Sequence, residues 1–339
     1  MKILVFEYIT GGGFNKQELP NSLIGEGSLM LNALLDNLIQ LKQTRLNYLE
    51  ITAMLDWRLD GSLGMAGINI VLIRSELDIS IEFARSVSQA DLVWPIAPES
   101  DGILQSLCQT VETLDKVLLT SPATAVAIAS DKFKTYELLV RHHIAAVPTR
   151  KLSDSSLDSF KEGDQWMVKP VDGVGCADSL VITDPQDFQQ MIARKGAYII
   201  QPHLQGAKIS LSCLFKQGRG WLVCANLQHF EFICRQYHLV DIVVNYHPDL
   251  ARYQPLVAKI ALALPDLWGY VGIDLIASPG CTWVLEINPR LTTSFVGIYA
   301  ALGVNIAEAI LLLLQGDPIL NTTCNKAITV QAKQEINAS

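Results

Sequence analysis

The spacing of apolar and polar positions changes repeatedly along the first 120 residues. Short apolar or alternating runs predict strands, whereas runs with apolar residues three or four positions apart predict helices. Strands are predicted at 2–8, 48–55, 68–73, 91–96 and 116–119, and helices at 26–41, 79–87 and 103–114. Because strands and helices alternate, residues 1–120 are predicted to form a Rossmann-like α/β domain with a parallel sheet.

The later apolar runs are shorter, and turn residues separate them. Strands are predicted at 165–170, 179–182, 198–201, 209–215, 270–277 and 282–287, with a helix at 133–142. Ser130 or Asp131 is suited to cap the start of that helix. The last two strands enclose the turn sequence Ser278-Pro279-Gly280, which predicts a β-hairpin.

Three polar side chains of this hairpin are oxygen ligands. With a period of two along each strand, Asp274 on the first arm and Glu286 and Asn288 on the second project to one face. Mg²⁺ favours one or two carboxylates together with substrate phosphates, and Arg290, which follows at once, suits a phosphoryl group. The set predicts a metal and phosphate site; the alternative is that surface acids stand there by chance.

Charge and hydropathy narrow the class of protein. The 339-residue chain is 50% hydrophobic with a formal net charge of -8, which argues against a nucleic-acid footprint. The longest purely apolar run, 309–314, is far shorter than the ~20 residues of a bilayer span. We therefore expect a cytoplasmic globular protein without membrane or nucleic-acid partners, for which a homodimer stays open.

The cysteines indicate neither a disulfide framework nor a zinc site. They stand at positions 108, 176, 213, 224, 234, 281 and 324, an odd number, and no two form a CxxC pair. We expect buried, reduced thiols.

The N-terminal domain has two loops where a parallel sheet binds its ligands, at 10–13 and 95–99. The first contains Gly11-x-Gly13, but Lys16 stands where a dinucleotide fingerprint has its third glycine. NAD and FAD are therefore disfavoured, and a small acceptor substrate or a plain chain reversal is favoured.

Acids near these loops suit an amine. Glu7, Glu26 and Glu99 could bind one, with Gly12 in the adjoining loop. Acids that cap helices or face solvent are the alternative.

A lysine and a glycine-rich loop follow in the middle of the chain. The strand ending near Lys169 leads into Asp172-Gly173-Val174-Gly175, whose backbone N–H groups suit phosphates. Lys132, at a helix start, is disfavoured by the helix dipole unless it faces solvent or meets an anion. The GK[ST] of a Walker A motif is absent, and a hairpin with a glycine turn is the alternative.

Two further segments carry weaker signals. The strand end Gln201-Pro202 turns at Leu204, and its backbone groups suit an adenine edge, although such hinges also occur without a nucleotide. Residues 229–247 contain three histidines, but their spacing fits no metal pattern. We expect these to be polar groups of helices or loops, with Arg235 a candidate substrate residue.

Taken in chain order, these motifs resemble the ATP-grasp superfamily over about residues 121–314, and the segment EINPRLTTS is especially specific. The N-terminal FEYITGGG, GEG and APE segments are similar to the branch that contains the tyramine–glutamate ligases of methanofuran biosynthesis. The resemblance implies an ATP-grasp fold, in which two α+β subdomains grip ATP, after the Rossmann-like domain. The implied units are 1–120, 121–200, 201–320 and a tail at 321–339.

The resemblance also implies a role for each motif. The implied residues are Lys132, Lys169, Gly173 and Gly175 at the ATP phosphates, Gln201, Pro202 and Leu204 at the adenine, Asp274, Glu286 and Asn288 at two Mg²⁺ or Mn²⁺ ions, and Arg290 at the γ-phosphate or acyl phosphate. Two positions depart from the family, because Lys208 replaces an acid for the ribose and Gly272 replaces an arginine. Asn226 and Gln228 are candidates for the missing polar contacts.

The activity implied by the resemblance is an ADP-forming ligation. A carboxylate, implied to be that of glutamate, would become an acyl phosphate, and tyramine or tyrosine would displace the phosphate. A ligase for another amino acid or amine stays open. So do a nucleotide-binding regulatory protein without catalysis and a dehydrogenase that uses the N-terminal sheet.

Overall fold

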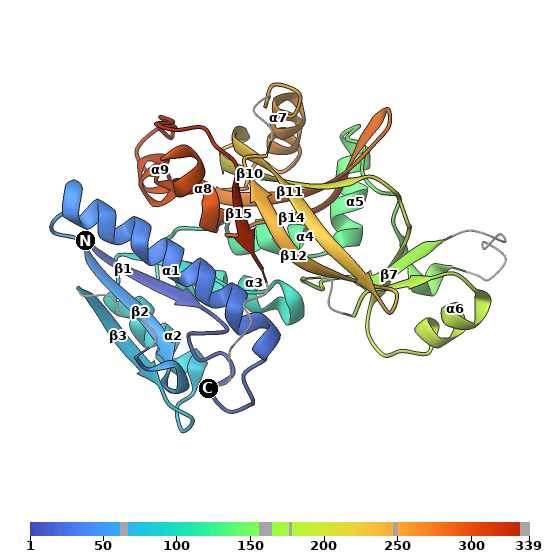
Figure 1. Ribbon diagram of the computed structural model, residues 1–339. Helices are drawn as coiled ribbons and strands as arrows, with labels where there is room; N and C mark the ends of the chain where they lie inside the picture. The colour runs from blue at the N-terminus through green and yellow to red at the C-terminus, as the bar shows by residue number, and fades with distance from the viewer. Residues whose placement is uncertain (62–66, 156–164, 176–177, 247–249, 333–339) are drawn as a thin grey trace.

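The structure, a computed structural model, describes residues 1–61, 67–155, 165–175, 178–246 and 250–332. Over these residues the chain forms sheets of five, six and four strands. Figure 1 shows the five-stranded sheet on one side, the six-stranded sheet in the middle and the four-stranded sheet, with β7 and α6, on the other side.

The N-terminal sheet is parallel throughout and has the order β3-β2-β1-β4-β5. Its elements are β1 (Lys2–Glu7), α1 (Asn21–Thr44), β2 (Glu50–Asp56), β3 (Ile68–Ile73), α2 (Ile79–Gln89), β4 (Leu92–Ile96), α3 (Ile103–Thr113) and β5 (Val117–Leu118). Ile3 and Val5 of β1 pack with α1, whereas Leu4 and Phe6 pack with α2 on the other face. The predicted parallel sheet is confirmed, although α1 begins at residue 21 rather than 26.

The central sheet is antiparallel and has the order β14-β13-β10-β11-β12-β15. Its strands are β10 (Ala207–Lys216), β11 (Arg219–Ile233), β12 (Gln236–Val244), β13 (Gly269–Ser278), β14 (Cys281–Asn288) and β15 (Ile328–Gln331). One face packs against α4 (Ala123–Ala129), α5 (Lys132–Arg141) and α7 (Gln254–Ala263), and the other against α8 (Phe295–Leu302) and α9 (Ile306–Leu313).

The smallest sheet has the order β6-β9-β7-β8 and a core of its own. Its elements are β6 (Arg150–Lys151), β7 (Trp166–Pro170), β8 (Leu180–Ile182), α6 (Pro185–Ile192) and β9 (Tyr198–Pro202). Val168 and Ile200 of the sheet pack against Phe188 of α6. This small unit carries the glycine loop and the hinge.

The packing groups the segments differently from the predicted boundaries. Helices α4 and α5 fall in the predicted unit 121–200, yet they share a hydrophobic core with the central sheet. The predicted tail contributes β15, which pairs with β12. Sequence-local patterns do not report these long-range pairings, because a short strand needs its neighbour to be stable.

The N-terminal domain is joined firmly to the central sheet. One hydrophobic core contains Leu34 and Leu38 of α1 together with Ile298 of α8 and Ile310 of α9. Figure 1 shows these three helices. Among the described residues, no single helix is long and apolar enough to cross a membrane; α8 and α9 reach that length only together and meet at 102°. The shared core fixes the N-terminal loops against the end of the β13–β14 hairpin.

The cysteines follow the prediction only in part. Cys108, Cys213 and Cys224 are buried, but Cys234 is exposed at the β11–β12 turn. Cys176 lies outside the described residues. Cys281 and Cys324 are partly buried, so the expectation that all the thiols are buried is wrong for Cys234 and holds only in part for these two.

Candidate active site

The β13–β14 hairpin brings the three predicted metal ligands together. Asp274 lies opposite Glu286, and Asn288 lies opposite Gly272. Nδ2 of Asn288 donates to Oδ2 of Asp274 at 3.0 Å, and Nε2 of Gln228 in β11 donates to Oδ1 of Asp274 at 3.2 Å. The predicted hairpin is confirmed, and its polar side chains share one face.

Two lysines from outside the hairpin converge on Glu286. The side chain of Asp131 caps α5 and places Lys132 at the first residue of that helix. Nζ of Lys132 lies 3.4 Å from Oε2 of Glu286 and donates a hydrogen bond to the carbonyl oxygen of Gly173. Lys169 in β7 is 8% exposed and acts on Glu286 through its charge. Lys132 thus meets an anion, as the unfavourable helix dipole requires.

The two hairpin carboxylates have pKa values shifted in opposite directions. Burial would raise the pKa of Glu286, but the charges of Lys132 and Lys169 outweigh it and lower the pKa. Burial, and then the charge of Glu286, raises the pKa of Asp274. A divalent cation between the two side chains would relieve the repulsion that raises the pKa of Asp274.

The hairpin residues fit a hard cation. They offer two carboxylates and the amide oxygen of Asn288, which Mg²⁺ and Mn²⁺ prefer. Within the described ranges, no group of three or more His, Cys, Asp or Glu side chains could hold a metal ion. A cation here would take its remaining ligands from water or substrate phosphates, as Mg²⁺ usually does.

The glycine loop after β7 contacts both neighbouring units. The carbonyl oxygen of Gly173 accepts from Lys132, and Oδ2 of Asp172 accepts from the backbone N–H of Asp101 at 2.9 Å. Gly175 has a φ of +60°, a left-handed conformation that favours glycine. The contact of Gly173 and Gly175 with phosphates stays a prediction.

The predicted hinge lies at the end of β9, whose last residue is Pro202. Gln201 is 2% exposed, and its Nε2 donates to Oγ1 of Thr149 at 2.8 Å. Nζ of Lys208 donates to the carbonyl oxygen of Leu204 at 3.4 Å. The side chain of Gln201 therefore braces the hinge from inside, and the adenine contacts of the hinge backbone stay predictions.

Three carboxylates of the N-terminal domain surround the exit of the hairpin. Oε2 of Glu99 accepts from Nε of Arg290 at 2.9 Å and lies 2.8 Å from its Nη2. Oε2 of Glu26 accepts from Oγ1 of Thr293 at 3.0 Å. Burial raises the pKa values of Glu26 and Glu7, and the charge of Arg290 offsets this only in part. Arg290 is thus the shared cation of this cluster.

Glu7 also organises the first glycine loop. Its carboxylate accepts from the backbone N–H of Ile9 at 3.2 Å, and from the backbone N–H and Oγ1 of Thr10 at 2.7 and 2.6 Å. A Cβ on Gly12 would lie 2.5 Å from the side chain of Ile73. Both residues therefore have a structural role, and a substrate contact of Gly12 stays a prediction.

Two predicted substrate residues have partners within the protein. Nδ2 of Asn226, which is fully buried, donates to Oγ of Ser212 at 3.1 Å, and its Oδ1 accepts from the backbone N–H of Asn245 at 3.2 Å. Arg235 pairs with Asp187 of α6 at the tip of the β11–β12 hairpin. The polar atoms of Asn226 are committed to the sheet, and Arg235 joins the central sheet to the small unit. Gln228 alone of the weaker candidates contacts a predicted metal ligand.

The histidine-rich segment forms β11 and β12, so the expectation of helix or loop groups is wrong. Nδ1 of His229 lies 2.7 Å from Oδ1 of Asp241 across the strand pair. His247 lies outside the described residues. Much of β12 is half-buried on both faces, which obscures the alternation that identifies a strand.

The sequence did not reveal a cluster of hydroxyl groups beside Gly272. The hydroxyl of Tyr270 donates to Oγ of Ser212 at 2.8 Å and lies 3.1 Å from Oγ1 of Thr292. A Cβ on Gly272 would stand 2.6 Å from Cγ2 of Thr292. A side chain at this position, such as the family's arginine, would therefore have to displace Thr292. The run Thr292-Thr293-Ser294 after the hairpin was the feature of the sequence that could have indicated this cluster.

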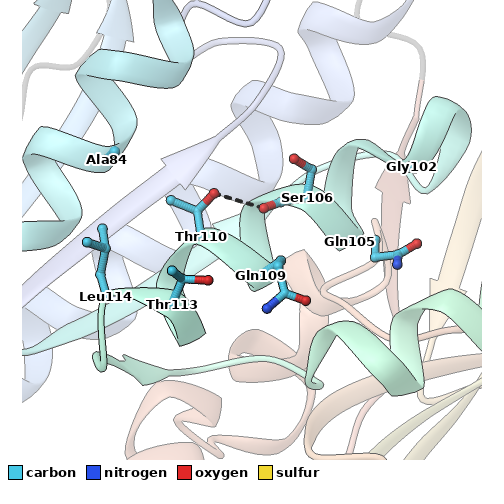
Figure 2. A pocket seen from close by; sticks show the side chains of 8 residues that line it. All are labelled: Ala84, Gly102, Gln105, Ser106, Gln109, Thr110, Thr113 and Leu114. Atoms are coloured by element: carbon cyan, nitrogen blue, oxygen red, sulfur yellow. Dashed lines mark hydrogen bonds between the residues drawn. The ribbon is translucent and has the colours of Figure 1, made fainter.

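The pocket in Figure 2 shares no residue with this site. It has a volume of about 450 Å³ and follows α3 beside α2. Its lining residues are Ala84, Gly102, Gln105, Ser106, Gln109, Thr110, Thr113 and Leu114. None of these side chains is an acid, a base or a nucleophilic thiol. The converging charges around the hairpin therefore make it the stronger candidate for the active site.

Comparison with known proteins gives matches over most of the chain. The ATP-grasp domain family matches residues 129–294, and the pre ATP-grasp 3 domain family matches residues 49–126. Tyramine–L-glutamate ligase of Methanocaldococcus fervens is 24% identical over 300 residues, which cover 87% of this chain and 89% of that protein. The ligase of the same name from Methanocaldococcus jannaschii is 25% identical over 303 residues, covering 87% and 84%.

A solved structure agrees with the sequence matches. A crystal structure of an Archaeoglobus fulgidus protein assigned to the ATP-grasp superfamily aligns with a TM-score of 0.70 at 22% identity, covering 98% of this chain and 92% of that one. The ATP-grasp fold predicted from the motifs is confirmed.

Proposed function

We propose that this chain, which belongs to the ATP-grasp family, is an ATP-dependent ligase that joins a carboxylate to an amine and releases ADP and phosphate. The similarity to tyramine–L-glutamate ligases supports glutamate as the carboxylate and tyramine as the amine, with tyrosine as the alternative amine. Such a reaction would serve the synthesis of a methanofuran-type cofactor.

The observation that carries the proposal is the convergence on Glu286. Lys132 from α5 and Lys169 from β7 face a carboxylate that is paired across the hairpin with Asp274. Cations facing clustered oxygen ligands suit a triphosphate with its metal. Asp274, Glu286 and Asn288 would hold Mg²⁺. When bound, the ion would neutralise charge on the phosphate oxygens.

The protein groups divide the reaction into two steps. An oxygen of the substrate carboxylate would attack the γ-phosphorus, ADP would leave, and Lys132 and Lys169 would stabilise the charge on the phosphoryl oxygens. The ammonium form of the amine would first lose one proton to solvent, and its nitrogen lone pair would then attack the acyl carbon. Phosphate would leave with the second amine proton, which leaves the amide. Arg290, at the hairpin exit, is the guanidinium placed to stabilise the oxyanion of that second step.

The reaction itself is the test. The whole protein is incubated with ATP, Mg²⁺ and glutamate, with and without tyramine, and ADP is followed by a coupled assay and products by mass spectrometry. Little ADP is expected without the amine, because a closed site protects the acyl group from water. With the amine, ADP, phosphate and a γ-glutamyl amide should form in equal amounts. ADP that accumulates without an amide would refute the proposal, whereas an amide with a different amine would correct only the substrate.

One observation favours a second candidate, a nucleotide-binding protein without catalysis. The arginine often found before the metal-binding aspartate is replaced by Gly272, where Thr292 fills the space. In that case ATP with Mg²⁺ would raise the melting temperature, but no ADP would form with any amine.

A further inference from the structure

Glu99 is a buried acid with one oxygen in use and one unused. It is 4% exposed, and its Oε2 is held by Arg290 through two nitrogens, at 2.9 and 2.8 Å. Its Oε1 is buried and has no hydrogen-bond partner among the described residues. A buried carboxylate oxygen without a donor destabilises the folded protein, because it has lost its hydrogen bonds to water and has no hydrogen bond within the protein. The arrangement is complete only when a donor approaches Oε1.

The surroundings favour a cationic donor. Glu7, Glu26 and Glu99 all interact electrostatically with Arg290, so three carboxylates share one guanidinium at the hairpin exit. The Glu7 carboxylate is engaged by the loop that it organises. Glu26 is only partly buried, and a single hydrogen bond, from Thr293, reaches its Oε2. Glu26 and Glu99 are thus the carboxylates with capacity left, and their negative charge favours a cationic donor.

We infer that Glu99 and Glu26 bind the ammonium group of a substrate beside Arg290. An ammonium group has three N–H donors and so can use Oε1 of Glu99 and the carboxylate of Glu26 together. The inference rests on the proposed ligase function, since both proposed substrates carry a primary ammonium: the acceptor amine itself and the α-amino group of glutamate. The contact would make the site selective for the ammonium compound, because a site that hydrogen-bonds an N–H group rejects an analogue that lacks this group.

Direct binding tests the inference without turnover. The melting temperature of the whole protein, with Mg²⁺ and a non-hydrolysable ATP analogue, is measured with tyramine against 4-ethylphenol and with glutamate against glutarate. In each pair the second compound lacks only the ammonium group. At least one ammonium compound should stabilise the protein more than its analogue. That difference should disappear in Glu99→Gln, and no difference in the unmodified protein would overturn the inference.

Steady-state kinetics give the second readout and identify the ammonium. In Glu99→Gln we expect the KM of one substrate to rise about tenfold or more, with a smaller change in kcat and an unchanged KM for ATP. A rise for tyramine assigns the site to the acceptor, and a rise for glutamate assigns it to the α-ammonium of the donor. Unchanged KM values for both substrates would refute the ammonium site.

A matched control separates this effect from a general loss of structure. Glu82→Gln removes a carboxylate that is 8% exposed and pairs with Arg85 in α2 of the same domain, away from the site. Its KM values should equal those of the unmodified protein. If Glu99→Gln fails to fold, Glu26→Gln makes the same test at a partly exposed position.

The two proposals fail separately. If the amide forms but the analogue pairs bind alike, the ammonium site is wrong and the ligase function stands. If no amide forms but the analogue pairs still differ, and differ less in Glu99→Gln, the ligase function is wrong and the ammonium site stands.

Discussion

The two ends of the active site hold their carboxylates in opposite electrostatic surroundings. Within the hairpin, Glu286 faces Lys132 and Lys169, and their charges lower its pKa despite burial. At the hairpin exit, the carboxylates of the N-terminal domain share Arg290, and burial raises the pKa of Glu26. The first end therefore has cations available for an anion, and the second has carboxylates available for a cation.

This difference matches the two kinds of group that a ligation must bring together. A triphosphate needs lysines and a metal, whereas an amine that attacks an acyl group arrives as an ammonium ion. Both ends are built on one hairpin and the loop that follows it, from Asp274 to Thr293. Because the strands of the hairpin are hydrogen-bonded to each other, we expect the distance between the ends to be set before any substrate binds.

The largest expected effect comes from a substitution within the hairpin, at the end where Lys132 and Lys169 face Glu286. Glu286→Gln keeps the shape of the side chain but removes the charge that Lys132 and Lys169 face and that a metal would need. Turnover should fall by ~10² or more, because that charge acts in the transition state. The protein should stay folded. Unchanged turnover would place the catalytic metal elsewhere, and Glu82→Gln serves as the control.

A smaller effect, on the free energy of unfolding, is expected from a substitution of Gly272, between the two ends. In Gly272→Ala the new Cβ would stand 2.6 Å from Cγ2 of Thr292, and such overpacking costs ~1–3 kcal/mol. Thr292→Ser removes that methyl group and keeps the hydroxyl that meets Tyr270 and Ser294. The double variant should therefore melt at a higher temperature than Gly272→Ala alone.

A Gly272→Ala protein that melts like the unmodified one would show that the space is not limited. It would then show that packing does not exclude a side chain at position 272, where the family often has an arginine. The argument that Arg290 takes the place of that arginine would be weaker. Thermal unfolding of the four proteins, unmodified, two single variants and double variant, completes the cycle.

The features that the sequence predicted well are local ones. The β13–β14 hairpin follows from alternation and a turn, and the cap of α5 follows from Asp131 next to an apolar-periodic run. The position of Lys132 on the helix dipole left two alternatives, that it faces solvent or meets an anion, and it meets Glu286. Each of these inferences uses only residues that are close to one another in the sequence.

The features that it missed depend on distant contacts. Glu99 and Arg290 are 191 residues apart, and contacts such as the shared core of α1, α8 and α9 bring their domains together. The obstruction at Gly272 arises from the packing of Thr292, which a pattern of residue types does not contain. The β12 strand was missed because a strand that is half-buried on both faces lacks the alternation of a strand with one buried face, and β11 has a run of buried residues instead of alternation.

The smallest expected effect belongs to an arginine–carboxylate pair outside both ends. Arg235 pairs with Asp187 and has 46% of its side chain exposed, so the pair should contribute about 0–1 kcal/mol. Arg235→Ala should therefore lower the melting temperature slightly and leave the KM values for ATP, glutamate and tyramine unchanged. Arg235 has a φ of +65°, which places it in the tight turn between β11 and β12, where it anchors the hairpin tip to α6. Steady-state kinetics with each substrate varied in turn provide the measurement. A several-fold rise in the KM of glutamate or tyramine would return Arg235 to the substrate site, and the two ends would then not account for the whole of that site.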